Sequence, residues 1–251
     1  MRVYRLFNVF LFLLITITTA SAHNFMPDND LWKDDIYYIN LKAAVDSSMF
    51  NKIMQGARDS YSNQKLTING DWSDPTVNAS CNVNSDGNIF INMYGGLARR
   101  PEVTLEGFTI VLCHELGHAF AGSPYLNSDT HVSAEGQADY YSTLTCYSKI
   151  ASKVTELSKI VNSSDFIKAK CSRYNDNQIN YANCVAKLEG GLSIGRLLST
   201  LDNETAPQYE TPDTIVVSET ELSYPATTQC RIDTYLAGTL AISRPACWFR
   251  Q

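Results

Sequence analysis

The sequence has few histidines, only four among its 251 residues. It also has no cluster of Lys and Arg after its first residues, and its formal net charge is −6. A surface that binds nucleic acid or anionic lipid needs clustered positive charge, so this pattern argues against nucleic acid as a partner. No CxxC pair occurs, which argues against a thioredoxin-like redox motif and against a cysteine-rich zinc ribbon.

Long-range organisation is equally plain. We find no internal repeat, no low-complexity linker and, after residue 22, no apolar run long enough to cross a bilayer. The hydrophobic content of 44% suits a globular protein with a sizeable core. Helical and strand-like patterns alternate irregularly, so we expect one α+β domain over residues 23–251. The oligomeric state is left open.

The N-terminus has the three parts of a secretory signal peptide. Arg2 and Arg5 form a short basic region, "LFNVFLFLLITITTA" forms an apolar core, and "ASA" at 20–22 fits a cleavage site for small residues. The apolar run is short for a membrane anchor, which is the alternative. We therefore predict a signal peptide at residues 1–22, a mature chain that starts at His23, and a secreted or periplasmic protein.

Seven cysteines suit an exported protein, in which most should pair and one should remain. We expect Cys113 to be the free thiol, because it lies inside a strongly apolar helical stretch where a reduced cysteine behaves as a small hydrophobe. The six others allow fifteen connectivities, and a short Cys171–Cys184 loop is the one pairing that we suggest.

Periodicity and turn residues predict the order of the elements. Strands are expected at 65–72, with a turn signal at Asn69–Gly70, and at 76–83 and 88–96, which the hairpin connection "NSDG" joins. Helices are expected within 30–62, at 103–122, at 134–150 with Ser133 as N-cap, in parts of 151–190, at 190–201 and at 230–242. The Pro- and Thr-rich stretch 202–229 is expected to be a loop that wraps the surface.

Two of the four histidines stand in "HELGH", residues 114–118. On a helix, His114 and His118 lie one turn apart on one face, so both imidazoles can reach one metal ion. Glu115 points to the adjacent face, where it can contact a metal-bound water. The motif arises by chance in on the order of one per cent of chains of this length, and its alternative is a core helix with two hydrogen-bonded histidines.

A zinc peptidase needs a third protein ligand, with the fourth position left for water. The pattern H-x-x-G-x-x-H does not continue from His118, since Ala121 and Pro124 stand at its later positions. The segment "SAEGQADYY" offers Glu135 as a ligand instead, and Asp139 four residues later as the partner of a ring N–H, that of His114 by preference. The alternative is a solvated acidic face, against which the small residues Gly136 and Ala138 argue.

HELGH followed by EGQAD resembles the gluzincin zinc metallopeptidases, which carry H-E-x-x-H and then E-x-x-x-D on a second helix. The sequence looks more closely like a group of secreted bacterial HExxH proteins. The segments that carry this likeness are "NGDWSDPTVNA", "MYGGLARRP", "CHELGHAFAG", "EGQADYYSTLTC", "CRIDTYLAG" and "RPACWF". The resemblance implies zinc, proteolysis and a compact gluzincin-like core, in which the edge of strand 88–96 binds an extended peptide substrate.

The chemistry expected of such a site is hydrolysis by a zinc-activated water, with Glu115 as the general base. A second donor should stabilise the oxyanion. Its candidates are His131, Tyr140 and Arg231, with Tyr141 and Tyr235 behind them. Each candidate has an alternative role. His131 would be a solvent-exposed loop histidine, the tyrosines would pack in the core, and Arg231 would form an ion pair with Asp233.

Two rival hypotheses for the function also include a bound zinc ion. One is a zinc-stabilised binding module that keeps the fold without turnover. The other is a zinc amidase that acts on cell-wall peptide. Because no structural need places a glutamate at position 115, Glu115 favours catalysis over a silent scaffold.

Overall fold

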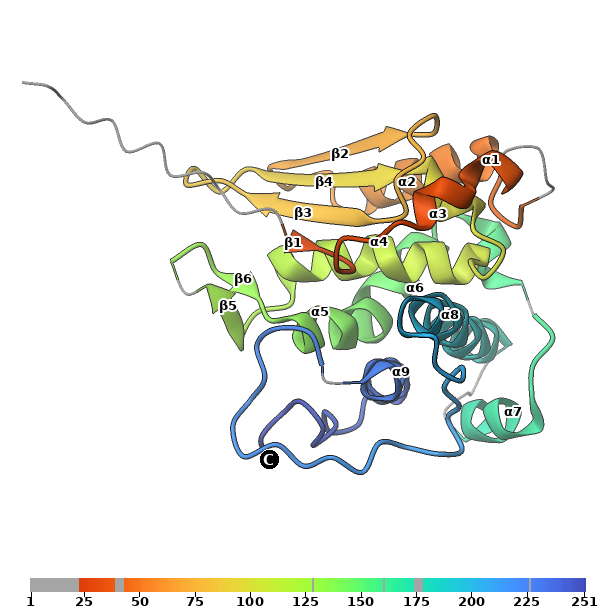
Figure 1. The fold of residues 1–251 in the computed structure, drawn as a ribbon, viewed down its shortest axis with the longest axis vertical. Helices are drawn as coiled ribbons and strands as arrows, with labels where there is room; N and C mark the ends of the chain where they lie inside the picture. The colour runs from red at the N-terminus through yellow and green to blue at the C-terminus, as the bar shows by residue number, and fades with distance from the viewer. Residues whose placement is uncertain (1–22, 39–42, 128, 160, 174–177, 226) are drawn as a thin grey trace, which may run out of the picture.

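The computed structural model describes residues 23–251 except 39–42, 128, 160, 174–177 and 226. The predicted signal peptide, residues 1–22, lies outside the described residues. The described chain is a mixed α+β structure, as expected: a small sheet lies along one side and most helices lie beneath it (Figure 1). Helix α4 (Leu105–Phe120) runs directly below the sheet, and α8 (Gln178–Asp202) and α9 (Thr228–Leu240) lie further from it.

The sheet has four strands in the order β1-β3-β4-β2. The strands are β1 (His23–Asn24), β2 (Leu66–Asp71), β3 (Ala79–Val83) and β4 (Ile89–Tyr94). Strands β3 and β4 form the predicted antiparallel hairpin, β1 pairs antiparallel with β3, and β2 pairs parallel with β4. Along β4 buried residues alternate with partly exposed ones, so the sheet places one face on the core.

The prediction that strand 88–96 offers a free edge is wrong. Strand β4 lies inside the sheet, with β3 on one side and β2 on the other. The sequence pattern gives the alternation along a strand but not its neighbours, and the parallel pairing of β2 comes from a crossover through other elements. Strand β3 packs against α4. Its outer edge is paired only with the two-residue strand β1.

The expected turn at Asn69–Gly70 is also absent, because both residues lie within β2. Gly70 is there for a packing reason: a Cβ on it would collide with the side chains of Met54 and Phe50. Both belong to α2 (Ser47–Ser60), which packs against β2. The glycine therefore lets a helix approach the strand and does not reverse the chain.

The remaining elements include helices within the expected ranges, with shifted boundaries, and three short elements at 95–99, 125–127 and 132–133 that were not predicted. They are η1 (Leu31–Asp34), α1 (Asp35–Tyr38), α3 (Gly95–Arg99), β5 (Tyr125–Asn127), β6 (Val132–Ser133), α5 (Glu135–Tyr141), the π-helical turn η2 (Ser142–Cys146), α6 (Tyr147–Ala151), η3 (Thr155–Ser158) and α7 (Asp165–Ser172). The short helix expected at 190–201 is the second half of the 25-residue α8. The predicted N-cap Ser133 instead ends β6, and Ala134 takes the cap position of α5 without a side-chain bond.

Helix α4 is buried on all sides. The Thr104 hydroxyl accepts from the amide of Gly107 and caps its start, and every residue from Glu106 to His118 is buried. Its closest approach to α5 occurs at Gly117, where a Cβ would stand 2.8 Å from the Cα of Ala138. The expectation that small residues bring the two helices together is thus confirmed for Ala138, whereas Gly136 makes room for the Trp248 ring.

Three disulfides join the described cysteines: Cys113–Cys146, Cys171–Cys184 and Cys230–Cys247. The second confirms the suggested short loop. The assignment of Cys113 as the free thiol is wrong, since it pairs with Cys146 of η2, and the free cysteine is Cys81 on β3. Both Cys113 and Cys81 are buried, so burial could not tell them apart; helix packing places Cys113 beside η2. Three disulfides fit a secreted or extracellular protein.

The segment between α8 and α9 wraps the surface, as expected, and docks on the site-bearing helices. The carbonyl of Leu222 accepts from the amide of Glu135, at the start of α5. The backbone amide of Glu221 donates to the carbonyl of Trp248, and that of Val217 donates to the carbonyl of Ala246. This loop therefore brings Tyr224, one of its two tyrosines, towards the start of α5. Among the described helices, none combines the length and the hydropathy needed to cross a membrane.

Candidate metal centre

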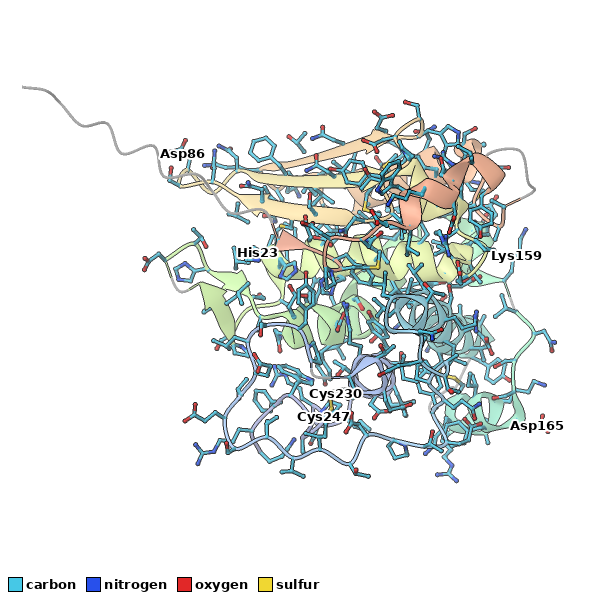
Figure 2. The ribbon with its side chains drawn as sticks, in the orientation of Figure 1. His23, Asp86, Lys159, Asp165, Cys230 and Cys247 are labelled. Carbon is cyan, nitrogen blue, oxygen red and sulfur yellow. A yellow bond between two sulfur atoms is a disulfide. The ribbon has the colours of Figure 1, made fainter. Side chains whose placement is uncertain are left out.

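Helices α4 and α5 bring the sequence-predicted site residues together. Helix α4 supplies His114, Glu115 and His118, and α5 supplies Glu135 and Asp139. The exposed fractions are 0% for the first three and for Asp139, and 3% for Glu135. Figure 2 gives the side chains in the context of the whole fold. Five polar side chains buried this deeply need partners, because burial of unpaired polar groups is costly.

One ligand atom from each of His114, His118 and Glu135 lies within 4.8 Å of the other two. Nε2 of His114 is 3.2 Å from Oε2 of Glu135, and Nε2 of His118 is 3.6 Å from Oε1. Ligands about 2.0–2.1 Å from one tetrahedral zinc stand about 3.4 Å apart, so these separations suit donors around a common ion. Within the described residues, both Nε2 atoms and Oε2 lack a hydrogen-bond partner. The residues present therefore fit a small divalent cation.

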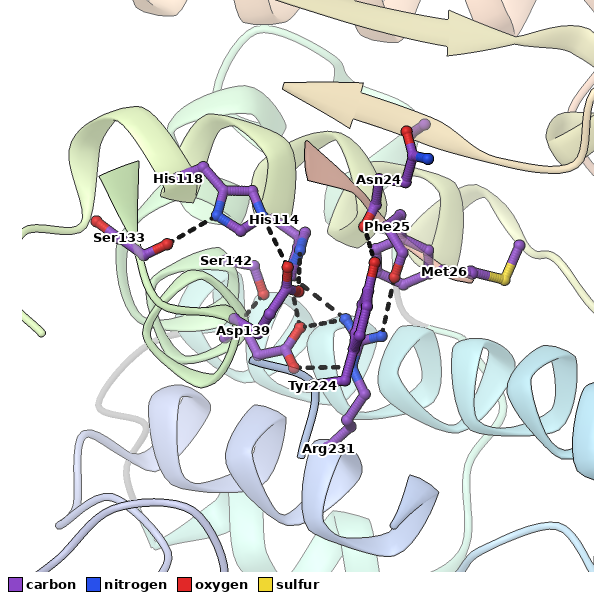
Figure 3. Close-up of polar contacts among 12 residues, drawn as sticks. Asn24, Phe25, Met26, His114, His118, Ser133, Asp139, Ser142, Tyr224 and Arg231 are labelled. Atoms are coloured by element: carbon purple, nitrogen blue, oxygen red, sulfur yellow. Dashed lines mark hydrogen bonds and ion pairs between the residues drawn. The ribbon is translucent and has the colours of Figure 1, made fainter. Parts of the chain in front are cut away.

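The other ring nitrogen of each histidine is held in place. Nδ1 of His114 lies 2.7 Å from Oδ1 of Asp139, as predicted, and Nδ1 of His118 lies 2.9 Å from the carbonyl oxygen of Ser133 (Figure 3). Both acceptors require a proton on Nδ1, so in the neutral ring each Nε2 carries the lone pair. The tautomers that a metal site needs are thus set by the surrounding chain.

Asp139 is the centre of a buried network. Arg231 of α9 binds it through two nitrogens, with Nε 2.8 Å from Oδ2 and Nη2 2.9 Å from Oδ1. The hydroxyl of Tyr235, also on α9, donates to Oδ1 at 2.9 Å. The suggested ion pair of Arg231 with Asp233 is wrong, since Asp233 accepts from the amide of Asp213 and from Gln229. Helix α9 therefore supports His114 through one carboxylate.

These contacts shift the pKa values in opposite directions. Burial alone would lower the pKa of His114, but the Asp139 carboxylate raises it to about 9. Burial would raise the pKa of Asp139, yet Arg231 and His114 hold it well below its usual range. His118 has a backbone carbonyl as its hydrogen-bond partner, and burial lowers its pKa to about 4. Burial opposes ionisation of Glu135, but His118 and His114 lower its pKa.

Glu115 differs from every other carboxylate at the site. Neither of its oxygens has a hydrogen-bond partner within the described chain, although the side chain is fully buried. Burial raises its pKa to about 8, with Glu135 and Asp139 adding to the shift against the attraction of His114 and Arg231. A carboxylate with a raised pKa and no protein partner suits a group that exchanges protons with a bound molecule.

Two of the predicted oxyanion donors are engaged elsewhere. His131 is exposed in the connection between β5 and β6, and its ring lies edge-on to Tyr125. Tyr140 donates its hydroxyl to the carbonyl of Ile242 at 2.8 Å, with the Arg244 guanidinium over its ring. The structure brings neither into the ligand group. Arg231 does reach the centre, but through Asp139.

Sequence reasoning missed three residues that border the centre. The Tyr224 hydroxyl donates to the carbonyl of Asn24, and burial, followed by the charge of Glu135, raises its pKa. The Phe25 ring lies edge-on to His114, with 5.0 Å between the ring centroids. Burial raises the pKa of the free Cys81, and the charges of Glu115 and Glu135 add to this shift. Tyr224 lies in an irregular loop, and Phe25 directly follows the two-residue strand β1, so no periodic pattern signalled either one.

A cavity of about 660 Å³ lies beside the centre. Tyr224 and Arg231 line it together with residues 27–31 and part of α8. None of the three ligand residues does, so the cavity adjoins the metal centre and does not contain it. A second group of ligand atoms, from Asp213, Cys230 and Cys247, has both sulfurs in a disulfide and offers no thiolate.

Comparisons with protein-family models, with curated proteins and with solved structures gave no match.

Proposed function

We propose that this protein is a secreted zinc-dependent endopeptidase with a gluzincin-like core. The observation that supports it most is the convergence of His114, His118 and Glu135, with unpaired donor atoms at zinc-ligand spacing, beside the unpaired carboxylate of Glu115. A structural zinc site is closed by four protein ligands, whereas a catalytic site has three and an open position. Three ligands and a free glutamate fit the second kind.

Zinc is the metal proposed because two imidazoles and one carboxylate are a donor set that it favours in hydrolases. When bound, it supplies a lowered pKa for water and polarises the carbonyl of the bond to be cut. His114, His118 and Glu135 hold it. Asp139, kept ionised by Arg231, orients the His114 ring and increases its basicity.

Glu115 accepts the proton from the attacking water and passes it to the leaving amine. Neither of its oxygens has a hydrogen-bond partner within the described chain, so the carboxylate is available to hold a proton between the two steps. The Tyr224 hydroxyl is the candidate donor to the carbonyl oxygen of the substrate, because it already donates to a peptide carbonyl next to the ligand histidines. Tyr224→Phe should lower kcat more than it raises KM.

The test compares the wild type, Glu115→Gln and Glu106→Gln in the cleavage of casein, with and without a chelator. Glu106 is a matched control, because it lies on the same helix and is also buried, two turns before the motif. We expect Glu115→Gln to bind one zinc per chain and to lose turnover by a factor of at least about 1,000, and Glu106→Gln to retain it. Full activity in Glu115→Gln would reject the mechanism.

The rival functions give different results in the same assay. A silent binding module would hold stoichiometric zinc and cut nothing. A cell-wall amidase would release fragments from peptidoglycan and leave casein intact. Purified protein without stoichiometric zinc would reject all three.

A further inference from the structure

The first described residues of the chain, 23–25, lie along the candidate metal centre. Strand β1 pairs antiparallel with β3 in the register His23 to Cys81 and Asn24 to Ser80, and the Phe25 amide extends the ladder to the carbonyl of Ala79 at 3.0 Å. In Figure 1, β1 lies between β3 and α4, the helix that carries the ligand histidines. Residues 23–25 are thus an extended peptide between the sheet and the metal centre.

Alternate side chains of this segment face the ligand histidines. The ring centroid of His23 is 5.6 Å from that of His118, and the ring of Phe25 is 5.0 Å from that of His114. This two-residue period is that of a strand whose one face lies on α4. A peptide substrate bound to the same edge would direct every second side chain into the same space.

The carbonyl groups of the segment are also recognised. The Tyr224 hydroxyl donates to the oxygen of Asn24, and Nη1 of Arg231 donates to that of Phe25 at 3.1 Å (Figure 3). Tyr224 comes from the loop before α9 and Arg231 from α9 itself, so two parts of the C-terminal region bind successive carbonyls of one extended strand. The edge of β3 on one side and the two carbonyl donors on the other thus hold the backbone of this segment.

The two halves of the segment are held unequally. Phe25 and Met26 have no exposed surface, and the Asn78 side chain binds both the amide and the carbonyl of Met26. His23 and Asn24 are only partly buried. The anchor is therefore at Phe25–Met26, and His23–Asn24 is the part that can leave the edge of β3 while the core stays intact.

We propose that His23–Asn24 is an internal competitor, which occupies the peptide-binding edge of β3 and must be displaced by a substrate that binds there in extended form, antiparallel to β3. The inference rests on the proposed function, since it names the surface that takes the peptide. It replaces the edge expected at 88–96, because β4 is paired on both sides. Of the described strands, β3 alone combines contact with α4 and an outer edge that only two residues cover.

The experiment ties the competitor in place. His23 and Cys81 are opposite residues in the ladder, and Cys81 is the free cysteine, so His23→Cys puts two thiols on one face at near-disulfide distance. His23→Ser is the matched control, because the serine side chain is similar in size to cysteine but cannot form the disulfide with Cys81. A chain that begins at Phe25 removes the competitor. All three carry Glu115→Gln, so that a bound probe is not cut.

The probe is fluorescein-labelled casein, and its affinity is measured by fluorescence anisotropy with zinc present. We expect the oxidised His23→Cys form to bind at least about tenfold more weakly than His23→Ser, and the chain that begins at Phe25 to bind about threefold or more tightly. Equal affinities in the three forms would overturn the proposal. Thiol titration in denaturant verifies the tether: no free thiol in the oxidised form and one in His23→Ser. Two thiols that stay free under mild oxidation would contradict the position of β1 itself.

The same variants with Glu115 restored separate this inference from the proposed function. If the protein is no peptidase, none of them cleaves casein, while the tether still weakens binding. If the competitor does not exist, cleavage proceeds equally in the tethered and untethered forms.

Discussion

The candidate metal centre joins two regions that differ in how they are built. Helices α4 and α5 carry the ligand group in two short motifs, each with a spacing of four residues. The C-terminal region, residues 203–251, supplies none of the three candidate ligands, yet its Arg231 and Tyr235 bind Asp139 and its Tyr224 borders the site. The first region supplies the donor atoms and the second fixes their orientation and charge.

The difference separates two kinds of contribution to one site. Ligands must project from one helix face, which local spacing alone ensures. Supporting residues need only arrive at the right place from any element, as Arg231 does from α9 across 92 positions of the sequence. Mutations in the two regions should therefore have distinct effects: loss of metal in the first, loss of stability and weaker metal binding in the second.

The largest expected contrast is in zinc affinity. Glu135→Ala removes a ligand and should weaken zinc binding by more than about 100-fold, whereas Tyr235→Phe removes one support of Asp139 and should weaken it by about tenfold or less. Competition with a chromophoric chelator measures both. Equal losses in the two variants would mean that the C-terminal region does more than orient the ligands.

The second contrast is in stability. Arg231→Met leaves the fully buried Asp139 with a weaker set of partners and should lower the free energy of unfolding of the metal-free protein by about 3–5 kcal/mol. The surface pair of Lys52 with Glu156 is the control, and Lys52→Met should change it by about 1 kcal/mol or less. Urea denaturation measures both. In a cycle with Asp139→Leu, additive effects would show that the two side chains are not coupled.

Each region also has its own disulfide. Cys113–Cys146 spans 33 residues, which include both motifs, and Cys230–Cys247 spans 17 residues of the C-terminal region. Loop entropy predicts losses of about 4 and about 3 kcal/mol when each pair is replaced by alanine. Zinc affinity should fall in the first double variant alone, because that bond ties α4 to η2. A matching fall in the second would remove the distinction.

The smallest expected effect lies in α8, which packs against both α4 and α9. Burial lowers the pKa of Lys187 there from 10.5 to about 8. Burying the charged ammonium group therefore lowers the free energy of unfolding. This loss is complete below pH 8, where Lys187 is charged in both states, and disappears as the pH rises to about 10.5. Lys187→Met should stabilise the protein at pH 7 by about 1–3 kcal/mol and have little effect at pH 10.5. Exposed Lys168→Met is the control, and a pH-independent gain would assign the effect to packing.

Prediction from sequence succeeded where one element decides the outcome. The β3–β4 hairpin and the span of α4 follow from local patterns, and the four-residue spacing places Glu135 and Asp139 on one helix face, from which Asp139 reaches His114. It failed where the outcome depends on which other element packs nearby. Strand β4 was expected to have a free edge but pairs there with β2, and Cys113 was expected to be a free thiol but pairs with Cys146. Gly70 looked like a turn because its partners, Met54 and Phe50, lie on a different element.

The sequence by itself determined the α+β class, the five site side chains of the HELGH and EGQAD segments and the short disulfide Cys171–Cys184, because each depends on residues close together in the chain. Only the tertiary structure decided which groups surround them: Arg231 and Tyr235 on Asp139, Tyr224 near the site, and His23–Asn24 on the edge of β3. Contacts between distant segments depend on how whole elements pack, and no local periodicity records that packing.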